Sequence, residues 1–171
     1  MDTGELAQAS RSHAWSVVSG VDEERIAYES EARDAAEDLS QLLSEFLDWW
    51  YRASFGDAAG RGEEARAVAK WRQGRVAILG RYRGMLDRLH RYGFDEKVQE
   101  IERAASDAVL ADQLIHHYYE SPAGKECISA LTVSERGRGP PPSHPLHAMF
   151  DAAHSRLCVD QQVTHAMNLA N

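Results

Sequence analysis

Apolar side chains recur every three or four positions through most of the chain, which is the pattern of amphipathic helices. The first such segment covers residues 6–18, and Gly20 is expected to end it. A second segment covers residues 22–54 and finishes in a cluster of aromatic residues. The Gly-rich stretch at residues 55–62 then predicts a break between helices.

Further helices are predicted over residues 63–92 and 95–118, followed by a shorter one over residues 121–131 that Ser and Pro open as N-cap and first-turn residue. Residues 134–145 are rich in Pro and Gly and predict a loop, because prolines lack the backbone donor that regular structure needs. A final helix is expected over residues 145–169. Alternating strand patterns are missing from the sequence, which predicts an all-α fold, an antiparallel helical bundle of about five to six helices.

The chain has 171 residues, the usual size of one domain. We expect residues 1–133 to form the bundle, residues 134–145 to connect, and residues 146–171 to pack as a C-terminal helix on the same domain. The Pro-rich loop around residues 137–142 has neither apolar anchors nor backbone donors at its three prolines, so it is expected to be the most mobile internal segment.

Charge is unevenly distributed along the chain. The net charge is −8, but residues 1–57 carry 13 acids and 4 bases, residues 61–92 carry 3 and 9, and residues 93–171 carry 11 and 6. A basic helix between two acidic regions either neutralises itself within the fold or offers a basic surface to an acidic partner. The sequence favours neutralisation within the fold, and the negative total makes nucleic acid an unfavourable partner.

The aromatic end of the second predicted helix is a candidate surface for binding another protein. Adjacent positions on a helix point about 100° apart, so a single core is expected to bury only one of Trp49 and Trp50. The candidate surface combines these two residues with a rim from the basic helix: Trp49, Trp50, Tyr51, Phe55, Arg81, Tyr82, Arg83 and Arg88.

Metal-ligand residue types recur at steps of three and four on the last predicted helix. His147, Asp151, His154 and Cys158 share one face and form a candidate transition-metal site. The alternative is a polar boundary beside the apolar face of that helix. A second stripe, formed by Asp112, His116 and Glu120, leaves the same two interpretations open.

Part of the basic helix, residues 75–86, resembles the LYR motif of small mitochondrial helical proteins. The Tyr-Arg pair is present as Tyr82-Arg83, and Arg81 stands where that motif has its leading Leu. The resemblance implies an accessory subunit or assembly factor that binds an acidic acyl carrier protein through a basic surface.

Catalytic and cofactor motifs are missing from the sequence, since the glycines of residues 56–62 lack the Lys-Ser/Thr of a phosphate-binding loop. We therefore expect no cofactor and a non-enzymatic helical interaction protein, a structural or accessory subunit within an oligomer or hetero-complex. The alternatives are a metal-binding helical-bundle enzyme and the LYR-like accessory protein. The sequence has only two cysteines and no C-x-x-C pair, and it shows no signal peptide and no apolar run long enough to span a membrane. We therefore expect the protein in the cytoplasm or another reducing compartment, and an organelle is left open.

Overall fold

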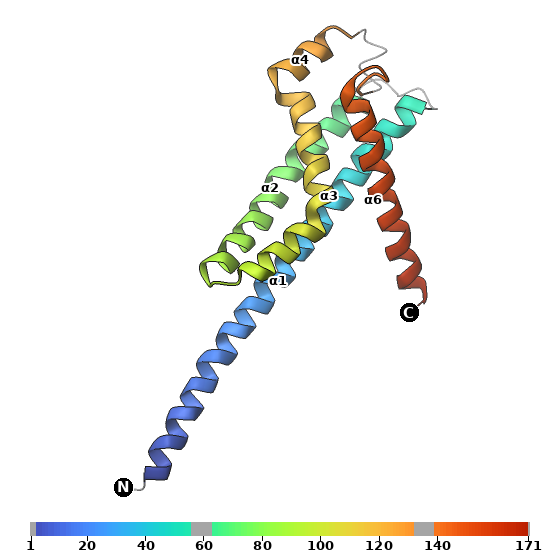
Figure 1. The fold of residues 1–171 in the computed structure, drawn as a ribbon. Helices are drawn as coiled ribbons and strands as arrows, with labels where there is room; N and C mark the ends of the chain where they lie inside the picture. The colour runs from blue at the N-terminus through green and yellow to red at the C-terminus, as the bar shows by residue number, and fades with distance from the viewer. Residues whose placement is uncertain (1–2, 56–62, 132–138, 171) are drawn as a thin grey trace.

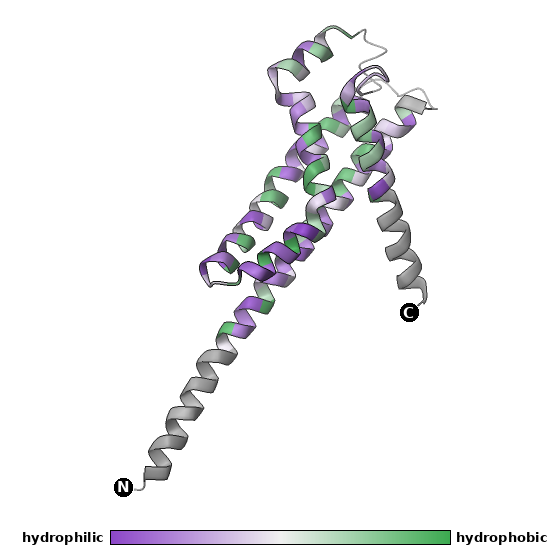
Figure 2. Ribbon diagram, in the orientation of Figure 1, coloured by the Kyte–Doolittle hydropathy of each residue, from purple (hydrophilic) through white to green (hydrophobic). Residues whose placement is uncertain are grey.

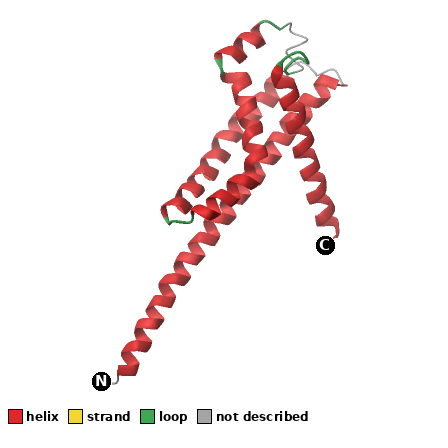
Figure 3. Ribbon diagram, in the orientation of Figure 1, coloured by secondary structure: helices red, strands yellow, loops and turns green. Residues whose placement is uncertain are grey.

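A computed structural model describes the backbone of residues 3–55, 63–131 and 139–170, and the side chains of residues 20–53, 63–131 and 139–157. No strand occurs in these ranges, and helices joined by short connections account for most of them (Figure 3). The helices are α1 (Thr3–Phe55), α2 (Glu63–Arg91), α3 (Asp95–Glu120), α4 (Pro122–Ser129) and α6 (Pro145–Ala170) (Figure 1). The prediction of an all-α helical bundle is confirmed.

The N-terminal half of the chain is one helix, not two. α1 continues without interruption through Gly20 for 53 residues, so the predicted break at this glycine is wrong. A glycine inside a helix costs only about 1 kcal/mol relative to Ala, and helix-forming neighbours on both sides outweigh that cost. Gly20 lies outside any helix–helix contact, since nothing lies within 4 Å of the position that a Cβ would take.

Two other helix ends follow the predicted signals. α2 stops at Gly93, whose φ of +83° is the left-handed conformation that favours glycine at a helix end. The Ser121 hydroxyl accepts a hydrogen bond from the backbone N–H of Gly124 at 2.9 Å, and Pro122 occupies the first turn of α4. This turn folds α4 back beside the end of α3 (Figure 1).

α1 is the spine of the bundle. α2 runs antiparallel along it, and α3 and α6 pack against it and against each other. Apolar positions concentrate where these helices face one another (Figure 2). One core cluster surrounds Trp50 and Trp71, and a second, smaller one surrounds Ala32, Leu89 and Ile101 nearer the α2–α3 turn.

The last helix belongs to the first core cluster. Leu146, Phe150 and Leu157 of α6 are buried in it. The preceding loop is anchored as well, because Gly139 and Pro140 are buried. The expectation that nothing in this loop anchors it is therefore wrong for residues 139–140, while residues 132–138 lie outside the described part of the chain.

No helix that the structure describes is both long and apolar enough to cross a lipid bilayer.

Candidate functional site

Trp49 and Trp50 are both buried, with 4% and 0% of their surfaces exposed. The expectation that one core could hardly hold both is wrong, because α1 is covered on two sides. The Trp50 ring lies 5.3 Å from that of His147 and 5.6 Å from that of Phe150, both on α6. The Trp49 ring lies 5.5 Å from Phe46, on the side of α1 that faces α2. Side chains that point about 100° apart thus meet different helices.

Three aromatic side chains of the predicted surface on α1 are described, those of Trp49, Trp50 and Tyr51. Of these, only Tyr51 is exposed. It is 43% exposed, and its ring stacks on His154 of α6 at 4.5 Å with an interplanar angle of 6°. The side chain of Phe55 lies outside the described residues. The structure therefore does not bring the four aromatic residues together as one exposed patch.

Two arginines of the predicted rim, Arg81 and Arg88, contact α1, and Arg83 is exposed. Arg81 forms ion pairs with Asp38 at 3.0 Å and with Glu31 at 3.9 Å. The guanidinium of Arg88 lies 5.4 Å from the ring centre of Tyr28. These contacts support the interpretation that the basic helix is neutralised within the fold.

The residues of the predicted metal site on α6 have other contacts. The Nδ1 atom of His147 lies 3.0 Å from the carbonyl oxygen of Pro140, which fixes the start of α6 to the preceding loop. Asp151 is exposed and His154 is half-buried, and the side chain of Cys158 lies outside the described residues. Among the described side chains, no group of three or more His, Cys, Asp or Glu could hold a metal ion. The site that includes Cys158 stays a prediction.

The second stripe of candidate ligands holds α2 and α3 together. Asp112 is only 2% exposed, and it accepts hydrogen bonds from Trp71 Nε1 at 3.1 Å and from Arg75 at 2.9 and 2.7 Å. The hydrogen bonds to Asp112 raise the pKa of Arg75 above its usual value, against the opposing effect of partial burial. A carboxylate satisfied in this way is a structural group, and it fixes the pairing of the two helices.

His116 and Glu120, the other two residues of that stripe, do not contact Asp112 in a shared site. His116 is exposed, and Glu120 accepts a hydrogen bond from Arg72 Nε at 2.7 Å. We conclude that this stripe acts through ion pairs between α2 and α3.

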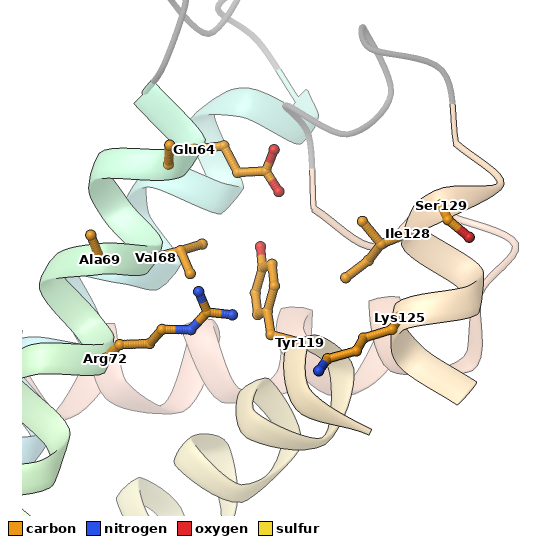
Figure 4. A pocket seen from close by; sticks show the side chains of 9 residues that line it. Glu64, Val68, Ala69, Arg72, Tyr119, Lys125, Ile128 and Ser129 are labelled. Atoms are coloured by element: carbon orange, nitrogen blue, oxygen red, sulfur yellow. The ribbon is translucent and has the colours of Figure 1, made fainter. Parts of the chain in front are cut away.

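A pocket of about 460 Å3 opens where α2, the end of α3 and α4 meet (Figure 4). The turn at Ser121 creates it by bringing α4 opposite the start of α2. The lining combines charged, hydroxyl and apolar groups: Glu64, Ala65, Val68, Ala69, Arg72, Tyr119, Lys125, Ile128 and Ser129. Its size lies within the range of small-molecule pockets.

Tyr119 stands at the centre of this pocket (Figure 4). It is 6% exposed, and its hydroxyl faces the Glu64 carboxylate. Burial raises the pKa of Tyr119 well above its ordinary value, the nearby Glu64 carboxylate adds to the rise, and Arg72 opposes it. The hydroxyl therefore stays protonated at neutral pH.

Sequence reasoning did not find this pocket. It predicted the turn at Ser121 but not the direction in which α4 leaves it, and that direction alone places Lys125 opposite Glu64 and Arg72. Lys125 lies far from Glu64 and Arg72 in the sequence, and the three residues follow no known motif.

The resemblance to the LYR family finds no support in the surroundings of its residues. Tyr82 is 6% exposed and belongs to the smaller core cluster, whereas Arg83 is exposed. Comparisons of the chain with protein-family models, with curated proteins and with solved structures found no match. Function has to be argued from the chain itself.

Proposed function

We propose that this chain is a non-enzymatic helical interaction protein that works within a larger protein assembly. The carrying observation is that α1 extends well beyond the bundle at its N-terminal end (Figure 1). The contacts nearest that end join α1 to the α2–α3 turn, where Arg25 lies 5.9 Å from the ring centre of Phe94 and Tyr28 lies 6.1 Å from Tyr92. About 20 residues, or roughly 30 Å of helix at 1.5 Å per residue, precede these contacts.

A lone helix of this length is marginal in water, because most helical stability in proteins comes from packing one face against other elements. In Figure 1 the segment runs clear of the other described helices. Its sequence is not that of a polar linker, since it contains Leu6, Trp15, Val17 and Val18. Packing of this helix against another protein would stabilise it.

Apolar side chains are exposed where the projecting segment joins the bundle. Ile26 is 56% exposed and Val21 is 37% exposed. A partner that lies along α1 would bury them together with the residues that precede them, in the helix-to-helix manner of many assemblies.

Site-specific photo-crosslinking in the source cells tests this proposal. A crosslinker at Ile26 should yield one discrete product with another protein chain. The matched control is Val76 on α2, which is 69% exposed but distant from the projecting segment, and it should yield little. Deleting residues 1–18 should remove the product at Ile26 without unfolding the bundle. Equal yields at the two positions, or no product at Ile26, would contradict an interaction through α1.

A further inference from the structure

We propose that the partner along the projecting part of α1 is a second copy of this chain, whose own α1 lies antiparallel to the first. This inference rests on the interaction through α1 proposed above, and it names the partner. Three observations carry it: an uncovered helix face, the charges at the two ends of that face, and the turn that limits how far a second helix can reach.

The face of α1 that packs into the bundle continues beyond the other described helices. Ala32 and Ala35 lie on this face and are 0% exposed, because α2 and α3 cover them in the smaller core cluster. About two helical turns before Ala32, the same face carries Arg25, whose guanidinium lies 5.9 Å from the ring centre of Phe94 on the α2–α3 turn. One turn further, Val21 is 37% exposed. Cover by the rest of the bundle therefore ends between Arg25 and Val21.

The sequence continues this face through the projecting segment. Counted back from Val21, the residues at steps of three, four and three are Val18, Ala14 and Arg11, and α1 is one helix across all of them. Steps of three and four are the spacing of the seam between two coiled helices. The result is a short apolar seam, formed by Ala14, Val18 and Val21, with Arg11 at its free end and Arg25 at its bundle end.

Charge selects the antiparallel direction and favours a second copy. The acidic residues 22–24 lie beside the seam at its bundle end, whereas Arg11 is the only Lys or Arg of residues 1–20. In a parallel pair, the two acidic runs would lie side by side and repel each other. In an antiparallel pair, Arg11 of each copy lies beside the acidic run of the other. Two equivalent attractive contacts then form, and the pair closes as a symmetric dimer.

The α2–α3 turn fixes the extent of the overlap. The Tyr92 ring on this turn lies 6.1 Å from the ring of Tyr28 on α1, so a second helix on this face reaches no further than Tyr28. An antiparallel helix whose first turn lies beside Tyr28 has its Arg11 opposite Val21, because each of these positions lies about two turns from its end of the overlap. Asp22 flanks Val21 in the heptad pattern, so its carboxylate would meet the guanidinium of Arg11 from the second copy.

Sedimentation velocity of the purified full chain tests the proposal. We expect a reversible monomer–dimer equilibrium, with a dimer fraction that rises with protein concentration. Val21→Glu should weaken the dimer by about 100-fold, because it places a charge in the seam once in each copy and each charge costs about ten-fold. The matched control is Val76→Glu, the same substitution at a 69% exposed valine on α2, which should leave the dissociation constant unchanged. Both valines are exposed in the single chain, so neither change should alter the far-ultraviolet circular dichroism spectrum.

A charge exchange tests the antiparallel contact itself. Arg11→Glu should weaken the dimer by about ten-fold or more. Adding Asp22→Arg in the same chain should restore most of that loss, because both contacts across the dimer then join opposite charges again. The matched control is Asp48→Arg, which breaks the pair with Arg52 inside the bundle as Asp22→Arg breaks the pair with Arg25, and it should restore nothing. If the two arginine substitutions restore the dimer equally, or if neither does, the antiparallel contact is wrong.

The outcome is distinguishable from that of the crosslink at Ile26. A chain that stays monomeric at every concentration, or that responds equally to Val21→Glu and Val76→Glu, would overturn the second copy as the partner. If such a chain still gives a discrete product with a different protein at Ile26, the interaction through α1 stands. If that product is missing as well, both proposals fail.

Discussion

The contact between Gly139 and Trp50 offers the sharpest test of how α6 is attached. Gly139 has a φ of +70°, and a Cβ built on it would lie 2.2 Å from Cδ1 and 2.8 Å from Nε1 of Trp50. Trp50 cannot move aside easily, because it is 0% exposed and packs between α1 and α6. We therefore expect Gly139→Ala to strain both the loop and the core.

The cost of Gly139→Ala has two parts. A non-glycine residue in the left-handed region loses about 1–2 kcal/mol, and the following Pro140 restricts this position further. Forcing a methyl group into a filled core costs about 1–3 kcal/mol more. The free energy of unfolding should fall by about 2–5 kcal/mol in total, a large part of the roughly 5–15 kcal/mol that holds an ordinary domain together.

Gly93→Ala is the control that isolates the packing part. Gly93 also has a positive φ, of +83°, but nothing lies within 4 Å of its Cβ position. This variant should lose only about 1–2 kcal/mol. Urea unfolding followed by far-ultraviolet circular dichroism measures both losses.

Repeating the substitution in a Trp50→Leu variant shows whether Trp50 causes the packing part of the loss in stability. In a Trp50→Leu chain the indole atoms are gone, so Gly139→Ala should cost about as much as Gly93→Ala does. If Gly139→Ala and Gly93→Ala lose equal stability in the native background, the loop does not pack on Trp50 and this account of the attachment of α6 is refuted.

Two further predictions concern buried polar groups. Asp112→Ala should lower the free energy of unfolding by about 3–5 kcal/mol, because it leaves Arg75 and Trp71 without their acceptor. The control Asp107→Ala breaks an exposed ion pair with Arg156 and should lower it by only about 0–1 kcal/mol. Equal losses in urea unfolding would contradict the structural role of Asp112. Tyr119 keeps its proton above the pH at which a tyrosine of the unfolded chain ionises, so stability should fall by up to about 1.4 kcal/mol per pH unit as the pH rises past about 10. Tyr119→Phe should make thermal melts less sensitive to pH in that range, and an unchanged slope would contradict the burial of its hydroxyl.

Local signals predicted most of the fold. Gly93 and the pair Ser121-Pro122 ended and began helices as expected, because their backbone preferences act within a few residues. Gly20 does not end a helix, for the opposite reason. Its preference is worth only about 1 kcal/mol, and the helix-forming residues on both sides decide the outcome.

The candidate site is formed by contacts between segments that are distant in the sequence. The hydrophobic pattern does not predict such contacts. Trp49 and Trp50 were expected to compete for one core, but α2 and α6 cover α1 from two directions and bury both. No sequence motif marks Tyr119 or Lys125, and the angle between α3 and α4 places them in one pocket. Such an angle follows from packing, and packing is not visible in a hydrophobic pattern.

The charge distribution bears on the partner surface proposed on α1. Four basic side chains of α2 pair with acids on α1 or α3: Lys70 with Glu45, Arg81 with Asp38, Arg72 with Glu120 and Arg75 with Asp112. Exposed pairs of this kind contribute only about 0–1 kcal/mol each to stability, but they reduce the positive field that would attract a nucleic acid or another acidic partner. The N-terminal part of α1 differs, because an acidic run at residues 22–24 lies between the exposed Val21 and Ile26. The partner proposed for this part of α1 would therefore need an apolar stripe flanked by Lys or Arg, whose charges would complement the acidic residues 22–24.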